Sequence, residues 1–206
     1  MDITLTGLSG VLLLTPRRFA DQRGHFTETW NRKTMQKAGL EIAFVQDNQS
    51  FSAEVGTVRG LHYQAPPHAQ TKLVRALQGA ILDVAVDVRL GSPSYGEWVA
   101  ENLSAENGAQ LLIPAGFLHG FVTLEPNTIV SYKVDAHYAP ECEGAVRFDD
   151  PDLAIDWGIS VGKAVLSDKD LAAPSFAAFD SPFRVSDYPL GSPPNAKMRE
   201  TTPALA

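Results

Sequence analysis

The sequence has one cysteine, Cys142, among its 206 residues. A single cysteine cannot form an internal disulfide, and it leaves no CxxC pair for a structural metal or a redox reaction. Long apolar runs are missing too, since none approaches the ~20 residues that a membrane-spanning helix needs. The first residues show no basic segment before an apolar run, so no signal peptide is expected. These absences predict a cytoplasmic protein that does not span a membrane.

Positive charge is also scarce. Lys and Arg total 17 against 24 Asp and Glu, which gives a formal net charge of −7. Such a chain is poorly suited to coating nucleic acid or an anionic membrane, because both carry dense negative charge. A few well-placed Arg and Lys residues remain compatible with a small anionic ligand. We therefore expect neither nucleic acid nor a membrane among the partners.

Short alternating or apolar segments dominate the first 150 residues. Residues 81–88 are the clearest case, with Leu or Val at the even positions and Asp83 and Asp87 among the odd ones. A period of two is the signature of a half-buried β-strand. Residues 128–134 behave likewise, and further strands are expected over residues 10–14, 25–30, 43–51, 72–78, 98–103, 110–113 and 120–124.

Few helices accompany these strands. Asn31 can cap a first helix that carries Met35 on its inner face and ends at Gly39, and Ser167 can cap a short one over residues 168–171. Many strands with few helices predict a mainly β sandwich or jelly roll. The length suits one domain, which we place over residues 1–185, and residues 186–206 form a polar, Pro-containing C-terminal tail.

Two spacings indicate a cupin-like jelly-roll barrel. Gly56-x5-His62 and the stretch from Gly108 to His119 fit large parts of the two motifs that cupins carry. In metal-binding cupins the first motif continues with a second His, where this chain has Gln64, and with a Glu, which is missing here. Imidazole and carboxylate ligands suit a divalent transition metal. We therefore expect a cupin barrel with no metal and no other cofactor, in which His62 is free for proton chemistry.

The segment Arg59-Gly60-Leu61-His62-Tyr63-Gln64 resembles the RGLHxQ-type segment of the dTDP-4-dehydrorhamnose 3,5-epimerase family. Further matches follow in the family's order from about residue 10 to residue 180, so the ordered set is specific although no single motif is. They are Asp21-x-Arg23-Gly24-x-Phe26-x-Glu28, Gln46-Asp47-Asn48-Gln49-Ser50, Lys72, Pro114-x-Gly116-x-x-His119-Gly120-Phe121, Tyr132-Lys133, Tyr138-x-Pro140-x-x-Glu143, Asp149-Asp150-Pro151 and Leu166-Ser167-Asp168-Lys169-Asp170.

This resemblance implies a metal-free isomerase that epimerises a nucleotide-activated 4-keto sugar. The implied substrate is dTDP-4-dehydro-6-deoxyglucose, inverted at C3 and C5 to dTDP-4-dehydro-L-rhamnose. The resemblance also implies a homodimer that lends an N-terminal segment to the neighbour's sheet, so that part of the site belongs to the partner chain.

The resemblance gives the chemistry to four residues. The C–H bonds at C3 and C5 lie next to the ketone, so epimerisation needs a base, a group that stabilises the enolate oxygen, and an acid on the opposite face. His62 is the implied base, since its ordinary pKa of ~6.5 is near the working pH. Asp170 is its implied partner, with Asp168 as the competing choice. Lys72 would stabilise the C4 oxygen, and Tyr132 would be the acid.

Substrate binding is assigned by the same resemblance. Arg23 and Arg59 would pair with the pyrophosphate, for which the guanidinium fork is well suited. Phe26 and Tyr138 would sandwich the thymine ring. The remaining residues would supply hydrogen bonds to base, ribose or sugar, or polar support beside the sugar: Glu28, Gln46, Asn48, Glu143 and His119.

Other functions stay open at this point. Close relatives epimerise only one carbon or serve other deoxysugar pathways, and the sequence does not separate them. A metal-dependent cupin, such as a dioxygenase or a phosphomannose-type isomerase, is disfavoured by Gln64 and the missing Glu. A non-catalytic sugar-binding jelly roll is disfavoured because binding alone needs no paired base and acid. Taken singly, Tyr132 would be a core aromatic and Asp170 a helix-start carboxylate.

Overall fold

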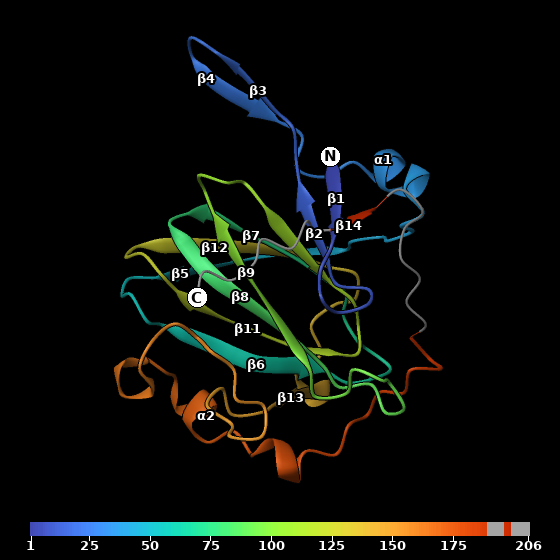
Figure 1. Cartoon of the computed structure of the whole chain (residues 1–206), viewed down its shortest axis with the longest axis vertical. Coiled ribbons are helices and arrows are strands. Elements are labelled where there is room, and N and C mark those ends of the chain that lie inside the picture. Colours follow the sequence, from blue (N-terminus) through green and yellow to red (C-terminus); the bar gives the residue numbers. More distant parts are fainter. Residues whose placement is uncertain (189–195, 199–206) are drawn as a thin grey trace.

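Two β-sheets face each other and enclose the core of the protein in the computed structural model, which describes residues 1–188 and 196–198 (Figure 1). Among these residues, seven strands form the larger sheet in the order β14-β1-β2-β10-β7-β12-β5, and five form the smaller sheet in the order β13-β6-β11-β8-β9. Apart from the parallel pair β1–β14, neighbouring strands in both sheets run antiparallel. The expected mainly β, cupin-like jelly roll is confirmed.

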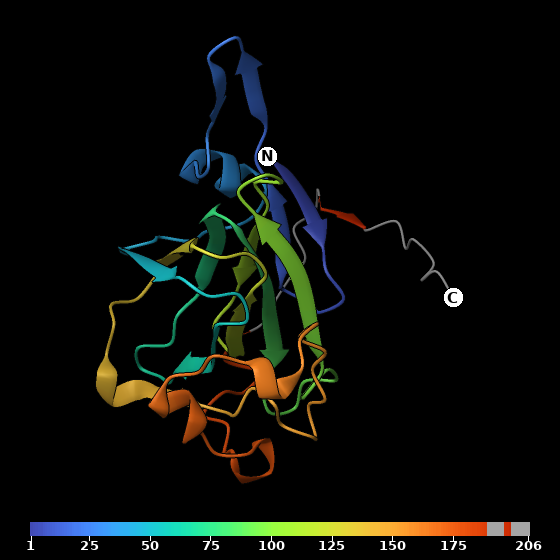
Figure 2. The same ribbon diagram turned by 90° about the vertical axis from the view of Figure 1, so that its left-hand side faces the viewer.

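The strands of the larger sheet are β1 (Asp2–Leu5), β2 (Leu12–Thr15), β5 (Gln46–Ser52), β7 (Lys72–Gln78), β10 (Gln110–Ile113), β12 (Thr128–Val134) and β14 (Lys197–Met198). Those of the smaller sheet are β6 (Val58–Gln64), β8 (Ala80–Asp87), β9 (Trp98–Ser104), β11 (Phe117–Thr123) and β13 (Glu143–Ala145). A separate hairpin, β3 (Arg18–Asp21) and β4 (Gly24–Thr27), projects away from the barrel (Figures 1 and 2).

The helices are short and begin where the sequence predicts. Asn31 caps α1 (Arg32–Lys37) by accepting a hydrogen bond from the Thr34 amide, and Met35 is fully buried. Ser167 caps α2 (Asp168–Leu171) by accepting one from the Asp170 amide. Single turns of 3₁₀ helix occur at Pro140–Cys142, Val161–Lys163 and Phe176–Ala178.

Both faces of the smaller sheet are covered. One face packs against the larger sheet, and the other packs beneath the C-terminal third of the chain through residues such as Trp157 and Phe183 (Figure 2). Strand β8 is therefore buried on both faces, and Asp83 and Asp87 are fully buried. The expectation of a half-buried strand at residues 81–88 is wrong. The distant C-terminal segment covers the face with the Leu and Val side chains, and the face that carries Asp83 is turned toward the larger sheet.

Strand β6 carries His62 but is not among the strands that alternation predicts. Gly60 interrupts its apolar pattern at a point where β6 and β11 approach unusually closely. A Cβ on Gly60 would lie 2.5 Å from the Gly120 Cα, and Gly60 has a φ of +127°. Only glycine fits both constraints, so this pair of glycines brings the strands of His62 and His119 together.

The expected tail is only partly described. Tyr188 packs its ring against Phe183, with 5.6 Å between centroids, and Lys197–Met198 pairs with β1. The rest of the expected tail, residues 189–195 and 199–206, lies outside the described residues, so the domain boundary stays a prediction. In the described part, no helix is both long and apolar enough to cross a membrane.

Candidate active site

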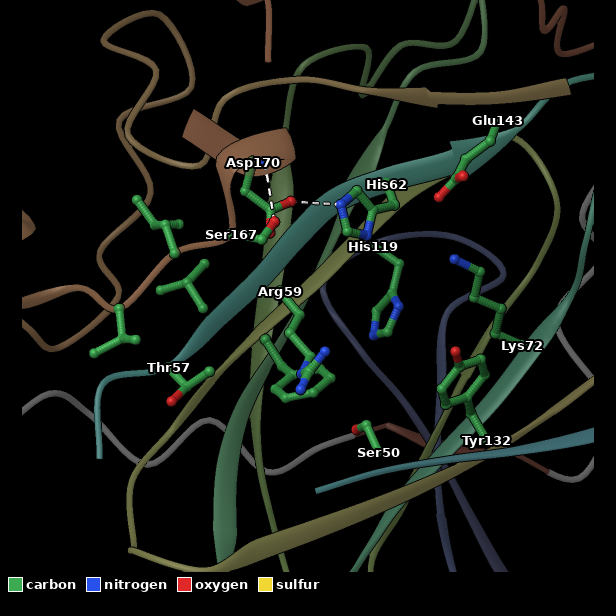
Figure 3. Close-up of a pocket in the computed structure, with 14 residues that line it drawn as sticks. Ser50, Thr57, Arg59, His62, Lys72, His119, Tyr132, Glu143, Ser167 and Asp170 are labelled. Atoms are coloured by element: carbon green, nitrogen blue, oxygen red, sulfur yellow. Dashed lines mark hydrogen bonds and ion pairs between the residues drawn. The ribbon is translucent and has the colours of Figure 1, made fainter. Parts of the chain in front are cut away.

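A cavity of about 500 Å³ opens between the two sheets (Figure 3). Seven elements contribute polar side chains to its wall, namely β5, β6, β7, β11, β12, β13 and α2. A second hollow of about 320 Å³ adjoins it and shares His62, Lys72, Tyr132 and Glu143. The four residues expected to carry the chemistry, His62, Lys72, Tyr132 and Asp170, all line the larger cavity.

His62 and Asp170 form a hydrogen-bonded pair at one wall. The His62 Nε2 lies 2.6 Å from Asp170 Oδ1, and the Ser167 hydroxyl donates to Asp170 Oδ2 at 2.7 Å (Figure 3). Burial raises the pKa of Asp170, but the hydrogen bonds from His62 and Ser167 outweigh it and leave this pKa below its ordinary value. Asp170 is thus held as a carboxylate facing His62, whereas Asp168 is exposed to solvent.

Lys72 and Tyr132 enter the cavity from the larger sheet, while His62 enters from the smaller one. Burial lowers the pKa of Lys72 to about 8, although Asp83 and Glu143 oppose this shift. Burial raises the pKa of Tyr132, with Arg59 acting against and Glu143 adding to the shift. At neutral pH, Tyr132 therefore carries its phenolic proton and Lys72 remains largely an ammonium ion.

Several expected binding residues surround the same space. Arg59 lines the larger cavity and donates to the Ser52 hydroxyl and the Phe51 carbonyl oxygen at 3.3 and 3.1 Å. In the second hollow, Tyr138 donates its hydroxyl proton to Glu143 at 2.7 Å. Gln46 and Asn48 line this hollow too, joined by a side-chain hydrogen bond of 2.8 Å.

Three expected binding residues do not reach the cavity of their own chain. Arg23 and Phe26 lie on the projecting hairpin, where Arg23 pairs with Asp21 and the Phe26 ring is exposed. Glu28 follows the hairpin and accepts a hydrogen bond from the Asn31 side chain at the start of α1. The hairpin points away from the barrel, so these three side chains lie outside the cavity of their own chain, and their part in substrate binding stays a prediction (Figure 1).

Two charged residues beside the cavity were missed from the sequence. Asp83 accepts a hydrogen bond from Nε2 of the buried His119 at 2.7 Å. This bond holds the His119 ring, which was expected to support the site, in the cavity wall. Lys169 forms an ion pair of 2.6 Å with Glu143. For Asp83, the sequence signal was a charged residue within the otherwise apolar run 81–88. For Lys169, it was a position inside the segment 166–170, which matches the family.

Gln64 stands where metal-binding cupins have a histidine ligand, and its side chain forms hydrogen bonds to the backbone. Its amide nitrogen donates to the carbonyl oxygens of His68 and His137, and its oxygen accepts from the Ala139 amide at 2.9 Å. Across the described residues, no group of three or more His, Cys, Asp or Glu side chains is placed to hold a metal. Metal independence itself stays a prediction, to be tested by experiment.

A jelly-roll cavity with a His–carboxylate pair on one wall and an ammonium and a phenol on the other defines an acid–base enzyme of the cupin-like class. A family model for dTDP-4-dehydrorhamnose 3,5-epimerase matches residues 5–178. The enzyme of that name from Sinorhizobium fredii is 50% identical over 177 residues, which cover 86% of this chain and 90% of the relative. The chain therefore belongs to the dTDP-4-dehydrorhamnose 3,5-epimerase family and is an isomerase.

Solved structures of the family are similar along nearly their whole length. The Bacillus anthracis enzyme, solved with TDP and PPi bound, is 48% identical with a TM-score of 0.82, over 85% of this chain and 99% of that chain. The Legionella pneumophila enzyme in complex with dTDP-4-keto-L-rhamnose is 42% identical with a TM-score of 0.83, over 87% and 94% of the two chains.

Proposed function

We propose that the protein inverts C3 and C5 of dTDP-4-dehydro-6-deoxyglucose and so forms dTDP-4-dehydro-L-rhamnose. The placement of His62 on the smaller sheet, paired with Asp170 of α2 and opposite Tyr132 on the larger sheet, carries this proposal. Two proton-transfer groups on opposite walls suit a reaction that removes a proton from one face of a carbon and returns one to the other. The family relationship supplies the identity of the nucleotide sugar.

In the proposed reaction, His62 removes the proton from C3 or C5 and becomes an imidazolium ion. Asp170 holds the ring in place and stabilises its positive charge. The electron pair moves into an enolate whose oxygen, at C4, faces the Lys72 ammonium ion, and a preorganised positive charge stabilises that oxygen. Tyr132 then gives its phenolic proton to the opposite face of the carbon, which inverts it.

We also propose that the protein works as a homodimer in the cytoplasm. The projecting hairpin offers Arg23 and the exposed Phe26 to a neighbouring molecule, which accounts for two expected binding residues that lie outside their own chain's cavity. Arg23 would then join Arg59 on the pyrophosphate, and Phe26 would face Tyr138 across the thymine ring. Sedimentation or light scattering would test the dimer directly.

Incubation with dTDP-4-dehydro-6-deoxyglucose in deuterated water tests the proposed function. Proton NMR should show loss of the C3 and C5 protons and the appearance of the rhamno-configured product. Exchange and inversion at one carbon only would instead support a single-carbon epimerase, which is the second candidate. No exchange at either carbon would overturn the proposal.

Arg59→Ala is expected to weaken binding of dTDP by about tenfold to 100-fold, because a hydrogen bond to a charged group contributes roughly 1.5–3 kcal/mol. Isothermal titration calorimetry would measure the change. Arg184→Ala is the matched control, since Arg184 is exposed and lines neither hollow. Equal dTDP affinity in Arg59→Ala and the parent would remove Arg59 from the pyrophosphate site.

Activity is expected to survive exhaustive chelation, because Gln64 is committed to backbone hydrogen bonds where a metal-binding cupin has a histidine. Turnover would be compared before and after dialysis against EDTA, together with elemental analysis of the purified protein. A large loss that a transition metal restores would favour the metal-dependent cupin alternative.

A further inference from the structure

Ser50 carries a buried hydroxyl group with no hydrogen-bond partner, in a residue that lines the larger cavity. Its Oγ is closed off from solvent, and it has no partner within residues 1–188 and 196–198. Folding removes such a group from water without replacing the lost hydrogen bonds, which destabilises the folded state. Native proteins contain few unpaired buried polar atoms, and a functional role is one reason to keep them.

The strand that carries Ser50 turns its polar side chains inward. Along β5, exposed residues alternate with half-buried or buried ones. The inward set is entirely polar and consists of Gln46, Asn48, Ser50 and Ser52. Antiparallel strands with one face on the core ordinarily turn apolar side chains to that face. The polar inner row of β5 therefore indicates that this strand faces a polar ligand.

The neighbours of Ser50 in this row already have partners. Gln46 Nε2 donates to Asn48 Oδ1 at 2.8 Å, and the Ser52 hydroxyl accepts from Arg59 Nε at 3.3 Å. Residues two apart on one face of a strand are separated by about 7 Å along the strand. Ser50 thus lies one side-chain position from the serine that binds Arg59, and both Ser50 and Arg59 line the larger cavity (Figure 3).

The chemistry of Arg59 indicates what kind of group the Ser50 hydroxyl can bind. A guanidinium group has only N–H donors, so Arg59 cannot accept the Ser50 proton. An anionic oxygen can accept from both side chains, and phosphate oxygens form strong hydrogen bonds of this kind. The Ser50 Oγ is carried on one rotatable bond, so a change between staggered positions can turn it from its buried position into the cavity.

We propose that Ser50 is a substrate-binding residue, which donates its hydroxyl proton to the diphosphate of the nucleotide sugar beside Arg59. This inference rests on the proposed function for the identity of the ligand. The hydroxyl finds no partner among the described residues of the free protein and gains one when the substrate binds. Its hydrogen bond therefore contributes to affinity and not to the stability of the free fold.

Ser50→Ala tests this role by measuring binding and stability together. In isothermal titration calorimetry the affinity for dTDP should fall about tenfold, because a hydrogen bond to a charged group is lost. The midpoint of thermal unfolding of the free protein should equal or exceed that of the parent, because the variant no longer buries an unpaired hydroxyl. An unchanged affinity, or a lower unfolding midpoint, would overturn the inference.

Ser131→Ala is the matched control. Ser131 lies opposite Gln49 on the neighbouring strand β12 and, like Ser50, it is half-buried. It lines a separate hollow, together with Asp47 and Lys133, and neither of the two hollows of the active site. Its affinity for dTDP should equal that of the parent.

Thymidine tests whether the contact is made to the phosphates. It has the nucleoside but no phosphate, so it should bind Ser50→Ala and the parent equally in an NMR titration. An equal loss of affinity for thymidine and for dTDP would place Ser50 on the nucleoside and overturn the inference. Light scattering would test a second copy of the chain as the source of the acceptor. Dissociation of a dimer in Ser50→Ala, with unchanged affinity for dTDP, would also overturn it.

Turnover of dTDP-4-dehydro-6-deoxyglucose separates this inference from the proposed function. In Ser50→Ala, KM should rise about tenfold while kcat stays near that of the parent, because the diphosphate is bound alike in the ground state and the transition state. A parent protein that binds dTDP but leaves this sugar unchanged would refute the proposed function and leave the binding inference intact. An active parent whose dTDP affinity and KM are unaffected by Ser50→Ala would refute the inference alone.

Discussion

Replacing His62 with alanine is expected to abolish solvent deuterium exchange at C3 and C5 of dTDP-4-dehydro-6-deoxyglucose. Loss of a positioned base typically costs about 10²–10⁴ in rate, and a weakly acidic C–H bond leaves little background. Proton NMR in deuterated water would measure the exchange. His68→Ala is the control, because His68 is exposed and lines neither hollow.

Tyr132→Phe distinguishes the base from the acid. The change removes only the phenolic hydroxyl, so His62, still paired with Asp170 at 2.6 Å, should continue to remove the proton. The proton would then return from its original face, giving exchange with little inversion, most clearly at C5. Exchange at the parent rate in His62→Ala, or full inversion at the parent rate in Tyr132→Phe, would show that these roles belong to other residues.

Elements governed by local rules were predictable from the sequence. The alternation at residues 128–134 corresponds to β12, and the caps at Asn31 and Ser167 begin α1 and α2. The hairpin β3–β4 and strand β6 were not predicted as they occur. In β6, Gly60 is required because β11 approaches closely at Gly120, which is 60 residues away in sequence. A contact between such distant residues leaves no local sequence pattern.

The site was predictable for a different reason. His62 and Asp170 are 108 residues apart in sequence, and only the ordered resemblance to a family pointed to their pairing. Asp83 escaped notice because its burial depends on tertiary packing, whereas its position in an alternating strand suggested exposure to solvent. The hairpin residues show the opposite limit, since the resemblance selects Arg23 and Phe26 whereas the fold places both outside the cavity of their own chain.

A buried charge pair, Asp87 and Arg89, lies at the end of β8. Arg89 donates from Nη2 to Asp87 Oδ2 at 2.6 Å and from Nε to Oδ1 at 2.9 Å, and both side chains are almost completely buried. Ser92 and Ser94 donate their hydroxyl protons to Asp87 as well. Burial raises the pKa of Asp87, but these hydrogen bonds outweigh it and leave the pKa below its ordinary value.

Arg89 also anchors the later part of the chain. Its guanidinium lies 4.7 Å from the centroid of the Phe117 ring, and Nη1 donates to the Tyr188 carbonyl oxygen at 3.4 Å. The neighbouring Leu90 amide donates to Phe183, whose ring is buried under the smaller sheet. The Arg89 side chain thus links the turn after β8 to the segment that covers the outer face of the smaller sheet.

Arg89→Met is therefore expected to lower the free energy of unfolding by about 3–5 kcal/mol, because it leaves the Asp87 carboxylate buried without its cation. Urea denaturation at one fixed protein concentration would measure the loss. Arg147→Met is the matched control: Arg147 pairs with Asp149 across the same two-residue spacing, but its side chain is 47% exposed, so it should cost no more than about 1 kcal/mol. The double variant Arg89→Met with Asp87→Asn removes both charges and should recover part of the loss. Equal destabilisation by Arg89→Met and Arg147→Met would show that the buried pair does not hold the covering segment in place.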